Sequence, residues 1–269
     1  DANGNTSVDA STATSTGTIT LFYEIEAGNA TTDTAQITID YGDFPTAQDD
    51  TLATLGAGNE YDVNTGSTLI IGAGIGLLNN DTLGSPAGAL TLWGGGDASA
   101  TVTLTPASST PFAGGTLTIN ADGSFDLVTP TIAGVYTFSY ILDNGLGTSQ
   151  GSVEIYVNAP ADAIDDPISV TNGGTNTGNI ITNDLGTAPL TVLSFGDSVA
   201  NVGIFPADGA TVGSFPAPGG GTLDVTIDSN GDLSVTANGT TGTGTVTIYY
   251  EIEAGNGTTD IAEIAITFG

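Results

Sequence analysis

The stretch Val246-Thr-Ile-Tyr-Tyr-Glu-Ile-Glu-Ala-Gly-Asn256 decides the fold, because its apolar and polar residues alternate until Ala-Gly-Asn turns the chain. A second alternating run follows over 262–268. Together the two runs predict a β-hairpin with one buried and one solvated face. The same pattern occurs at 19–41 and, in a more divergent form, at 136–157.

The first of these copies belongs to a longer internal repeat. Residues 1–42 recur without a gap as residues 228–269, and 25 of the 42 positions are identical. A chain that ends on the motif with which it began is typical of an array built by repeating one structural unit.

A further hairpin precedes each of the later copies, at 116–127 and 222–235, with Asp-Gly or Asn-Gly at the turn. Helix signals are almost absent, and the chain has 40 Gly and 11 Pro. We therefore predict an all-β fold of tandem immunoglobulin-like (cadherin-like) β-sandwich modules. The predicted division is 1–42 as the closing strands of a partial module, followed by complete sandwiches at 43–158 and 159–269.

The composition excludes much chemistry. The chain contains no Lys, Arg, His or Cys and has 30 acidic residues, so its formal charge is −30. It cannot form a Ser-His-Asp triad, a thiolate nucleophile or a Schiff base. It also lacks the basic groove that nucleic acid requires. We predict a protein that is not an enzyme and does not bind nucleic acid; a glycosidase with two facing carboxylates is the alternative.

The sequence contains no run of about 18 apolar residues and no basic-then-apolar N-terminal segment. We therefore expect no direct membrane insertion by these 269 residues. Any anchor or export signal is expected outside them.

Each complete module also carries a series of short motifs. A paired Asp (Asp49-Asp50; Asp165-Asp166) is followed by an Asn-Asp step (Asn80-Asp81; Asn183-Asp184), then Gly-Thr-Leu, Asp/Asn-Gly, and a closing Tyr-x-Leu/Ile-Asp/Glu strand. This order resembles the bacterial cadherin-like and immunoglobulin-like tandem repeats of large extracellular adhesins and surface proteins. The resemblance implies a stalk or fibre module, extracellular or on the cell surface, stiffened by Ca²⁺ near module junctions.

The residues themselves also point to a cation. In a sandwich of this topology we expect the start of the first strand, the loop after the second and the turn of the last hairpin to share one pole. Their hard oxygen ligands suit Ca²⁺. The candidate ligands are Asp49, Asp50, Asn80, Asp81, Asp143 and Asn144 in the first complete module, and Asp165, Asp166, Asn183, Asp184 and Glu253 in the second. The alternative is that Asp and Asn occur there because they favour turns.

Three smaller features have two interpretations each. Asp228 to Asp232 begins like an EF-hand loop, but Leu233 and Gly239 stand where Gly and Glu are required, so a hairpin turn is predicted. Trp93 is predicted to fill the core, with an exposed ligand-stacking ring as the alternative. Five Asn-x-Ser/Thr sequons are sites for glycans or products of composition: Asn5, Asn29, Asn80, Asn238 and Asn256.

The sequence therefore predicts a non-enzymatic structural repeat region of an extracellular adhesin or cell-surface filament, giving length, stiffness and protease resistance. Its expected partners are adjacent modules or identical subunits, and surface glycans. One alternative is a self-assembling filament subunit that uses residues 1–42 for strand addition to a neighbour. The other is a carbohydrate-binding module.

Overall fold

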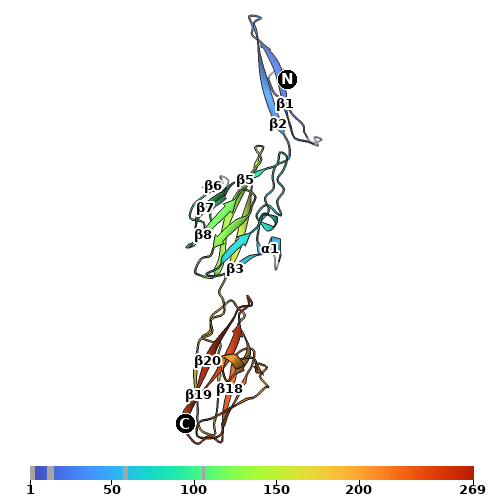
Figure 1. Cartoon of the computed structure of the whole chain (residues 1–269). Coiled ribbons are helices and arrows are strands. Elements are labelled where there is room, and N and C mark those ends of the chain that lie inside the picture. The colour runs from blue at the N-terminus through green and yellow to red at the C-terminus, as the bar shows by residue number, and fades with distance from the viewer. Residues whose placement is uncertain (1–3, 11–14, 57–59, 105–106) are drawn as a thin grey trace. The chain divides into compact units, whose positions relative to one another are not determined.

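The computed structural model describes residues 4–10, 15–56, 60–104 and 107–269, and these are almost entirely strands and turns (Figure 1). The only helical elements in these residues are a single α-turn and two 3-10 turns: α1 (Leu52–Leu55), η1 (Ala73–Ile75) and η2 (Val199–Asn201). No helix in the described part of the chain is long and apolar enough to cross a membrane. The chain divides into two compact units, residues 1–157 and 158–269.

The second unit is a β-sandwich of two sheets. One sheet has the strand order β12-β20-β19-β14-β15, and the other has the order β13-β18-β17-β16. β20 pairs antiparallel with β19 but parallel with β12. The strand bounds are β12 (Asp166–Val170), β13 (Thr175–Asn179), β14 (Thr191–Gly196), β15 (Phe205–Pro206), β16 (Gly213–Pro216), β17 (Thr222–Ile227), β18 (Asp232–Asn238), β19 (Gly244–Glu253) and β20 (Thr259–Phe268).

The first unit contains a sandwich with the same strand order. Its sheets are β3-β11-β10-β5-β6 and β4-β9-β8-β7, so each strand has a counterpart nine places later in the chain. The bounds are β3 (Tyr61–Asn64), β4 (Thr68–Ile71), β5 (Ala89–Gly94), β6 (Val102–Thr103), β7 (Ala107–Phe112), β8 (Gly115–Asn120), β9 (Phe125–Val128), β10 (Gly134–Asp143) and β11 (Thr148–Asn158).

Alternation produces both cores. In β19 the side chains of Ile248, Tyr250 and Ile252 are buried, and the residues between them are only half-buried. The predicted hairpins at 116–127, 136–157, 222–235 and 246–268 are all confirmed, as is the all-β sandwich fold. Trp93 fills the first core as predicted: it is 1% exposed, and its Nε1 donates a hydrogen bond to Ser108 Oγ at 2.7 Å.

The Asp-Gly and Asn-Gly pairs form the expected turns. Gly123 and Gly231 have φ values of +81° and +82°, a conformation that glycine adopts without a steric penalty. Asp228 Oδ1 accepts hydrogen bonds from the N–H groups of Asn230 and Asp232, both at 2.9 Å. The EF-hand-like segment is therefore a side-chain-stabilised hairpin turn, as predicted.

The first unit also contains the predicted hairpin of residues 19–41. It consists of β1 (Gly17–Glu26) and β2 (Thr32–Tyr41), which form a two-stranded sheet of their own. One face of each hairpin was expected to be buried, but Ile19, Leu21 and Tyr23 on the apolar face of β1 are each more than 40% exposed. The apolar face of a two-stranded hairpin becomes buried only when a second layer of structure packs against it.

Candidate functional site

The two sandwiches each contain a buried tyrosine whose hydroxyl group meets two separate loops. Tyr140 lies on β10 and Tyr250 on β19, at equivalent positions of equivalent strands, and both are 0% exposed. Each ring fills the core, and its hydroxyl reaches the Asp of the Asn-Asp step; the Tyr250 hydroxyl also reaches the second Asp of the pair. We call these groups the first and second tyrosine–carboxylate sites.

In the first site, the Tyr140 hydroxyl is surrounded by acceptors. It lies 3.0 Å from the Gln48 carbonyl, 3.1 Å from the Leu77 carbonyl, and 3.0 and 2.9 Å from the two carboxylate oxygens of Asp81. The Gln48 N–H donates to Asp81 Oδ1 at 2.7 Å. Asp81 therefore links the loop after β4 to the segment that enters the module.

The second site repeats this geometry. The Tyr250 hydroxyl lies 3.1 Å from the Ile164 carbonyl, 3.2 Å from the Ile180 carbonyl, and 3.1 and 3.2 Å from the Asp184 oxygens. The Ile164 N–H donates to Asp184 Oδ1 at 2.7 Å. A fifth acceptor, Asp166 Oδ2, lies 2.9 Å from the hydroxyl.

Each site therefore has more acceptor oxygens than donor protons. A tyrosine hydroxyl carries one hydrogen, so it can donate to only one of its four or five neighbours at a time. The chain has no Lys, Arg or His that could supply further donors. Main-chain N–H groups of Gln48 and Ile164 supply one further donor to each site, and the oxygens that still lack a donor could accept a proton or a cation.

The first member of each Asp pair has a structural role. Asp49 Oδ1 accepts a hydrogen bond from the Ser152 N–H at 2.8 Å, and Asp165 Oδ1 accepts one from the Glu263 N–H at 3.0 Å. Both side chains are exposed. These bonds fix the entering segment to the last strand of its module.

The second member of each pair has a perturbed pKa. Asp50 is 1% exposed; burial raises its pKa to about 8, and the nearby Asp81 charge contributes in the same direction. Burial also raises the pKa of Asp166, to about 6, although the hydrogen bond from Tyr250 acts against that increase. The pKa values of Asp81 and Asp184 are raised as well, mainly by burial.

Several oxygens at the sites have no donor. Neither carboxylate oxygen of Asp50 has a hydrogen-bond partner, and the same is true of Asn80 Oδ1 and, in the second module, Asn183 Oδ1. Unpaired carboxylate and amide oxygens are the ligands that Ca²⁺ prefers. The acidic groups do not form a site alone, because no three carboxylates in the described residues are grouped to hold a metal. The oxygens free to bind a cation are thus those of Asp50 and Asn80 in the first site, and in the second site that of Asn183, beside the Asp166 carboxylate.

The last hairpin turn does not bring its predicted ligands, Asp143 and Asn144, to the first site. Asp50 pairs with Val153 on β11, whereas Asp143 pairs with Thr148, five residues away and hence about 17 Å along the strand. Asp143 Oδ1 instead accepts the Gly145 N–H at 2.7 Å. Asn144 Nδ2 donates to the Asp43 carbonyl at 2.6 Å.

Glu253 is displaced in the same way. It pairs with Thr259, while Asp166 pairs with Ile264, again five residues further along the last strand. The turn chemistry of Asp and Asn thus accounts for Asp143 and Asn144, and distance separates Glu253 from the second site. The structure brings together Asp49, Asp50, Asn80 and Asp81, and likewise Asp165, Asp166, Asn183 and Asp184.

Both tyrosines were absent from the predicted ligand set. The signal for them was the closing Tyr-x-Leu/Ile-Asp/Glu strand, in which the tyrosine is the apolar-face residue with a hydroxyl group. A buried tyrosine usually needs a partner for that hydroxyl.

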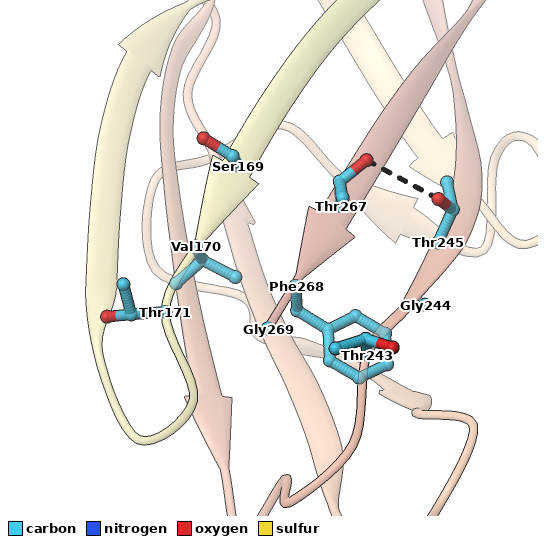
Figure 2. Close-up of a pocket in the computed structure, with 9 residues that line it drawn as sticks. All are labelled: Ser169, Val170, Thr171, Thr243, Gly244, Thr245, Thr267, Phe268 and Gly269. Atoms are coloured by element: carbon cyan, nitrogen blue, oxygen red, sulfur yellow. Dashed lines mark hydrogen bonds between the residues drawn. The ribbon is translucent and has the colours of Figure 1, made fainter.

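A shallow pocket lies away from these sites, at the end of the second module where β12 and β20 finish (Figure 2). Thr245 and Thr267 face each other there, with their Oγ1 atoms 3.4 Å apart. No carboxylate lines this pocket, whose lining residues are Ser169–Thr171, Thr243–Thr245 and Thr267–Gly269. The pocket thus offers no general acid or base.

No protein-family model matches the sequence, and no curated protein matches it. Among solved structures, an I-band fragment of titin is similar at 10% identity over 85% of this chain and 65% of its own, with a TM-score of 0.42. Extracellular domains 3–5 of Drosophila OTK match at 10% identity over 93% of this chain and 70% of theirs, with a TM-score of 0.41. The insect immune protein hemolin matches at 13% identity over 92% and 56%, with a TM-score of 0.37. The chain thus spans less than two thirds of the titin fragment and of hemolin, and the likeness concerns the fold alone.

Proposed function

We propose that this chain is a non-enzymatic, load-bearing segment of an extracellular adhesin or surface filament. The observation that carries the proposal is the pairing of β12 with β20, the first and last strands of the second module. They run parallel over five residue pairs, from Asp166 with Ile264 to Val170 with Phe268. The chain therefore enters this module at one end of the pair and leaves at the other.

This geometry governs how the module responds to tension. A force applied through the two ends slides β12 along β20, so the hydrogen bonds of the pair are loaded together instead of one after another. In the first module, Asp50 pairs in parallel with Val153, between the entering segment and the last strand. The same direction of loading applies there.

The tyrosine–carboxylate sites support this role, because they fasten the entering segment to the core. Tyr250 connects Asp166 on the first strand with Asp184 in the loop after β13. We propose that Ca²⁺ occupies these sites outside the cell and is held by Asp50 and Asn80, and by Asp166 and Asn183. The cation would supply the positive charge that the sequence lacks.

Single-molecule pulling on the full chain tests the mechanical role. Unfolding of residues 158–269 should lengthen the chain by at most about 38 nm, at roughly 3.4 Å per residue. Adjacent N–H groups of a strand point to opposite sides, so only one of Ile168 and Ser169 donates its N–H to β20. Replacing that residue by proline removes a main-chain hydrogen bond between β12 and β20. That variant should lower the unfolding force of this module.

Val225→Ala is the control, because it weakens the same core from β17, a strand that pairs with neither β12 nor β20. At equal loss of equilibrium stability it should lower the force much less than the proline variant. Equal effects on force would contradict a mechanical role for the parallel pair.

The carbohydrate-binding alternative, for which Trp93 and a few Tyr are the candidates, receives no support from Trp93. Trp93 is buried and packs edge-on against Phe138, with ring centroids 6.1 Å apart, so it cannot stack on a sugar from solvent.

A further inference from the structure

The β1–β2 hairpin has the geometry of the hairpin that closes the second module. Gly17 pairs with Tyr41 and Glu26 with Thr32. In β19 and β20, Gly244 pairs with Phe268 and Glu253 with Thr259, so every pair is shifted by the same 227 residues as the sequence repeat. The two hairpins are alike in sequence and identical in length and register.

Their apolar faces differ in what covers them. Ile248, Tyr250 and Ile252 of β19 are 0% exposed. The counterparts of these residues on β1 are exposed: Leu21 is 44%, Tyr23 46% and Ile25 59% exposed. β1 and β2 thus present a core face that lacks its opposite layer.

The complete module shows what that layer is. β12 pairs with β20, β14 pairs with β19, and the sheet β13-β18-β17-β16 supplies the rest of the core. The Tyr250 hydroxyl lies within hydrogen-bond distance of carboxylate oxygens of both Asp166 and Asp184. Tyr23, its counterpart, lies on a face where none of these strands is present.

Three N-terminal residues lie beside the β1–β2 hairpin and leave its apolar face exposed. Gly4, Asn5 and Thr6 line a groove together with Leu21, Tyr23, Ile25 and Ile37. By the repeat they correspond to Gly231, Asp232 and Leu233, and Leu233 packs in the second core with the residues of β19 and β20.

We propose that the apolar face of β1–β2 binds the opening half of an immunoglobulin-like module of this same type. The partner supplies counterparts of β12, β14 and the facing sheet, and its Asp pair and Asn-Asp step accept the hydrogen of the Tyr23 hydroxyl. An intact second copy of residues 43–269 does not fit, because both of its modules already contain their closing hairpins. This inference rests on the structural role proposed above, to which it adds the partner.

The first test transplants the hairpin within the full chain. Residues 244–268 are replaced by residues 17–41, which are equal in number, so that this hairpin meets the opening half of the second module. We expect a folded module with a urea midpoint close to that of the parent. Leu21→Asp in the transplanted copy should prevent folding, whereas Phe22→Asp should not, because Phe22 lies on the other face and is 76% exposed.

The second test uses two separate chains. A chain ending at Thr243 keeps β1–β2 and has an opening half without β19 and β20, so it should assemble head to tail into oligomers seen by sedimentation. The full-length chain carries the β1–β2 hairpin but no opening half that lacks its closing hairpin. When added, it should therefore cap the oligomers and shorten them. Tyr23→Phe should weaken assembly at least tenfold.

The proposal is overturned if the transplanted hairpin leaves the module unfolded. It is also overturned if neither Leu21→Asp nor added full-length chain changes the size of the oligomers that the truncated chain forms. Such oligomers would be non-specific aggregates. A full-length chain that dimerises through this face would show that a second copy is the occupant. None of these results bears on the pulling experiment, in which residues 17–41 play no part, so the two proposals fail separately.

Discussion

The Tyr250 hydroxyl lies 2.9 Å from Asp166 Oδ2, whereas the equivalent carboxylate of the first module, that of Asp50, has no hydrogen-bond partner at all. The two sites are otherwise alike in position and in their bonds to the Asn-Asp step. Burial and the charges of Asp81 and Asp49 therefore raise the pKa of Asp50, opposed only in part by the side chain of Asn80. The first site is therefore the one more sensitive to protons and cations.

The stability of the first module should fall as the pH rises from about 4 to about 8. Folded Asp50 keeps its proton up to about pH 8, whereas the unfolded carboxyl group releases it near pH 3.8. The folded state thus binds more protons between these values, and the contribution of Asp50 to stability is lost as the pH rises through its folded pKa. The loss is on the order of a few kcal/mol.

Trp93 makes this measurable, because it is the only tryptophan and lies in the first core. Its fluorescence should give a lower urea midpoint at pH 9 than at pH 5, with a chelator present. Asp50→Asn should flatten the dependence, and Asp166→Asn should leave the Trp93 curve as it is. Identical midpoints at the two pH values would show that Asp50 ionises in the fold at no cost.

Removing the Tyr250 hydroxyl should destabilise the second module by about 1–3 kcal/mol, because Asp184 and two main-chain carbonyls lose their shared donor. Urea unfolding of Tyr250→Phe followed by circular dichroism measures the change. Tyr249→Phe is the matched control, since this neighbouring side chain points to the other face of β19. It should change the free energy of unfolding by less than about 0.5 kcal/mol. Similar losses in both variants would mean that the buried hydroxyl group contributes nothing.

Deleting residues 1–42 should leave both sandwiches folded. Neither hydrophobic core includes a described residue from this segment. The variant should be a soluble monomer, and its Trp93 fluorescence transition should match that of the parent. A shift of the urea midpoint by more than about 1 M would show that the hairpin supports the first module, given a typical urea m value of 1–3 kcal/mol/M.

The hairpins could be predicted because alternation and Asp-Gly or Asn-Gly turns act locally, within 10 to 25 residues. The meeting of Asp50 with Asp81 was also predictable, since the order of strands in a sandwich brings the first strand beside the loop after the second. Two things were beyond the sequence. The apolar pattern around Tyr140 predicts a core residue, and nothing in that pattern indicates that its hydroxyl forms the centre of the first tyrosine–carboxylate site. The displacement of Asp143 depends on strand register, which fixes how far along β11 a turn lies.

Calcium should stabilise the first module more than an equal ionic strength of sodium chloride. Asp50 and Asn80 provide unpaired buried oxygens, and the charges of Asp49 and Asp81 lie close by. Sodium ions only screen such repulsion, whereas a divalent cation bound to the folded state stabilises it by about 2.7 kcal/mol at one hundred times its Kd. Millimolar Ca²⁺ at pH 8 should therefore raise the Trp93-detected Tm by several degrees beyond the sodium control.

The same experiment identifies the ligands. Replacing Asp49 and Asp50 together by Asn should remove the excess Tm shift reported by Trp93. Replacing Asp165 and Asp166 together by Asn should leave that shift in place. It should instead remove the excess shift that circular dichroism detects for the second module. Asp143→Asn should have no effect on either, because Asp143 lies about 17 Å along β11 from the first site. If calcium and sodium chloride raise both transitions equally, the carboxylates are neutralised by protons instead, and the pH dependence of Asp50 should then persist unchanged in saturating Ca²⁺.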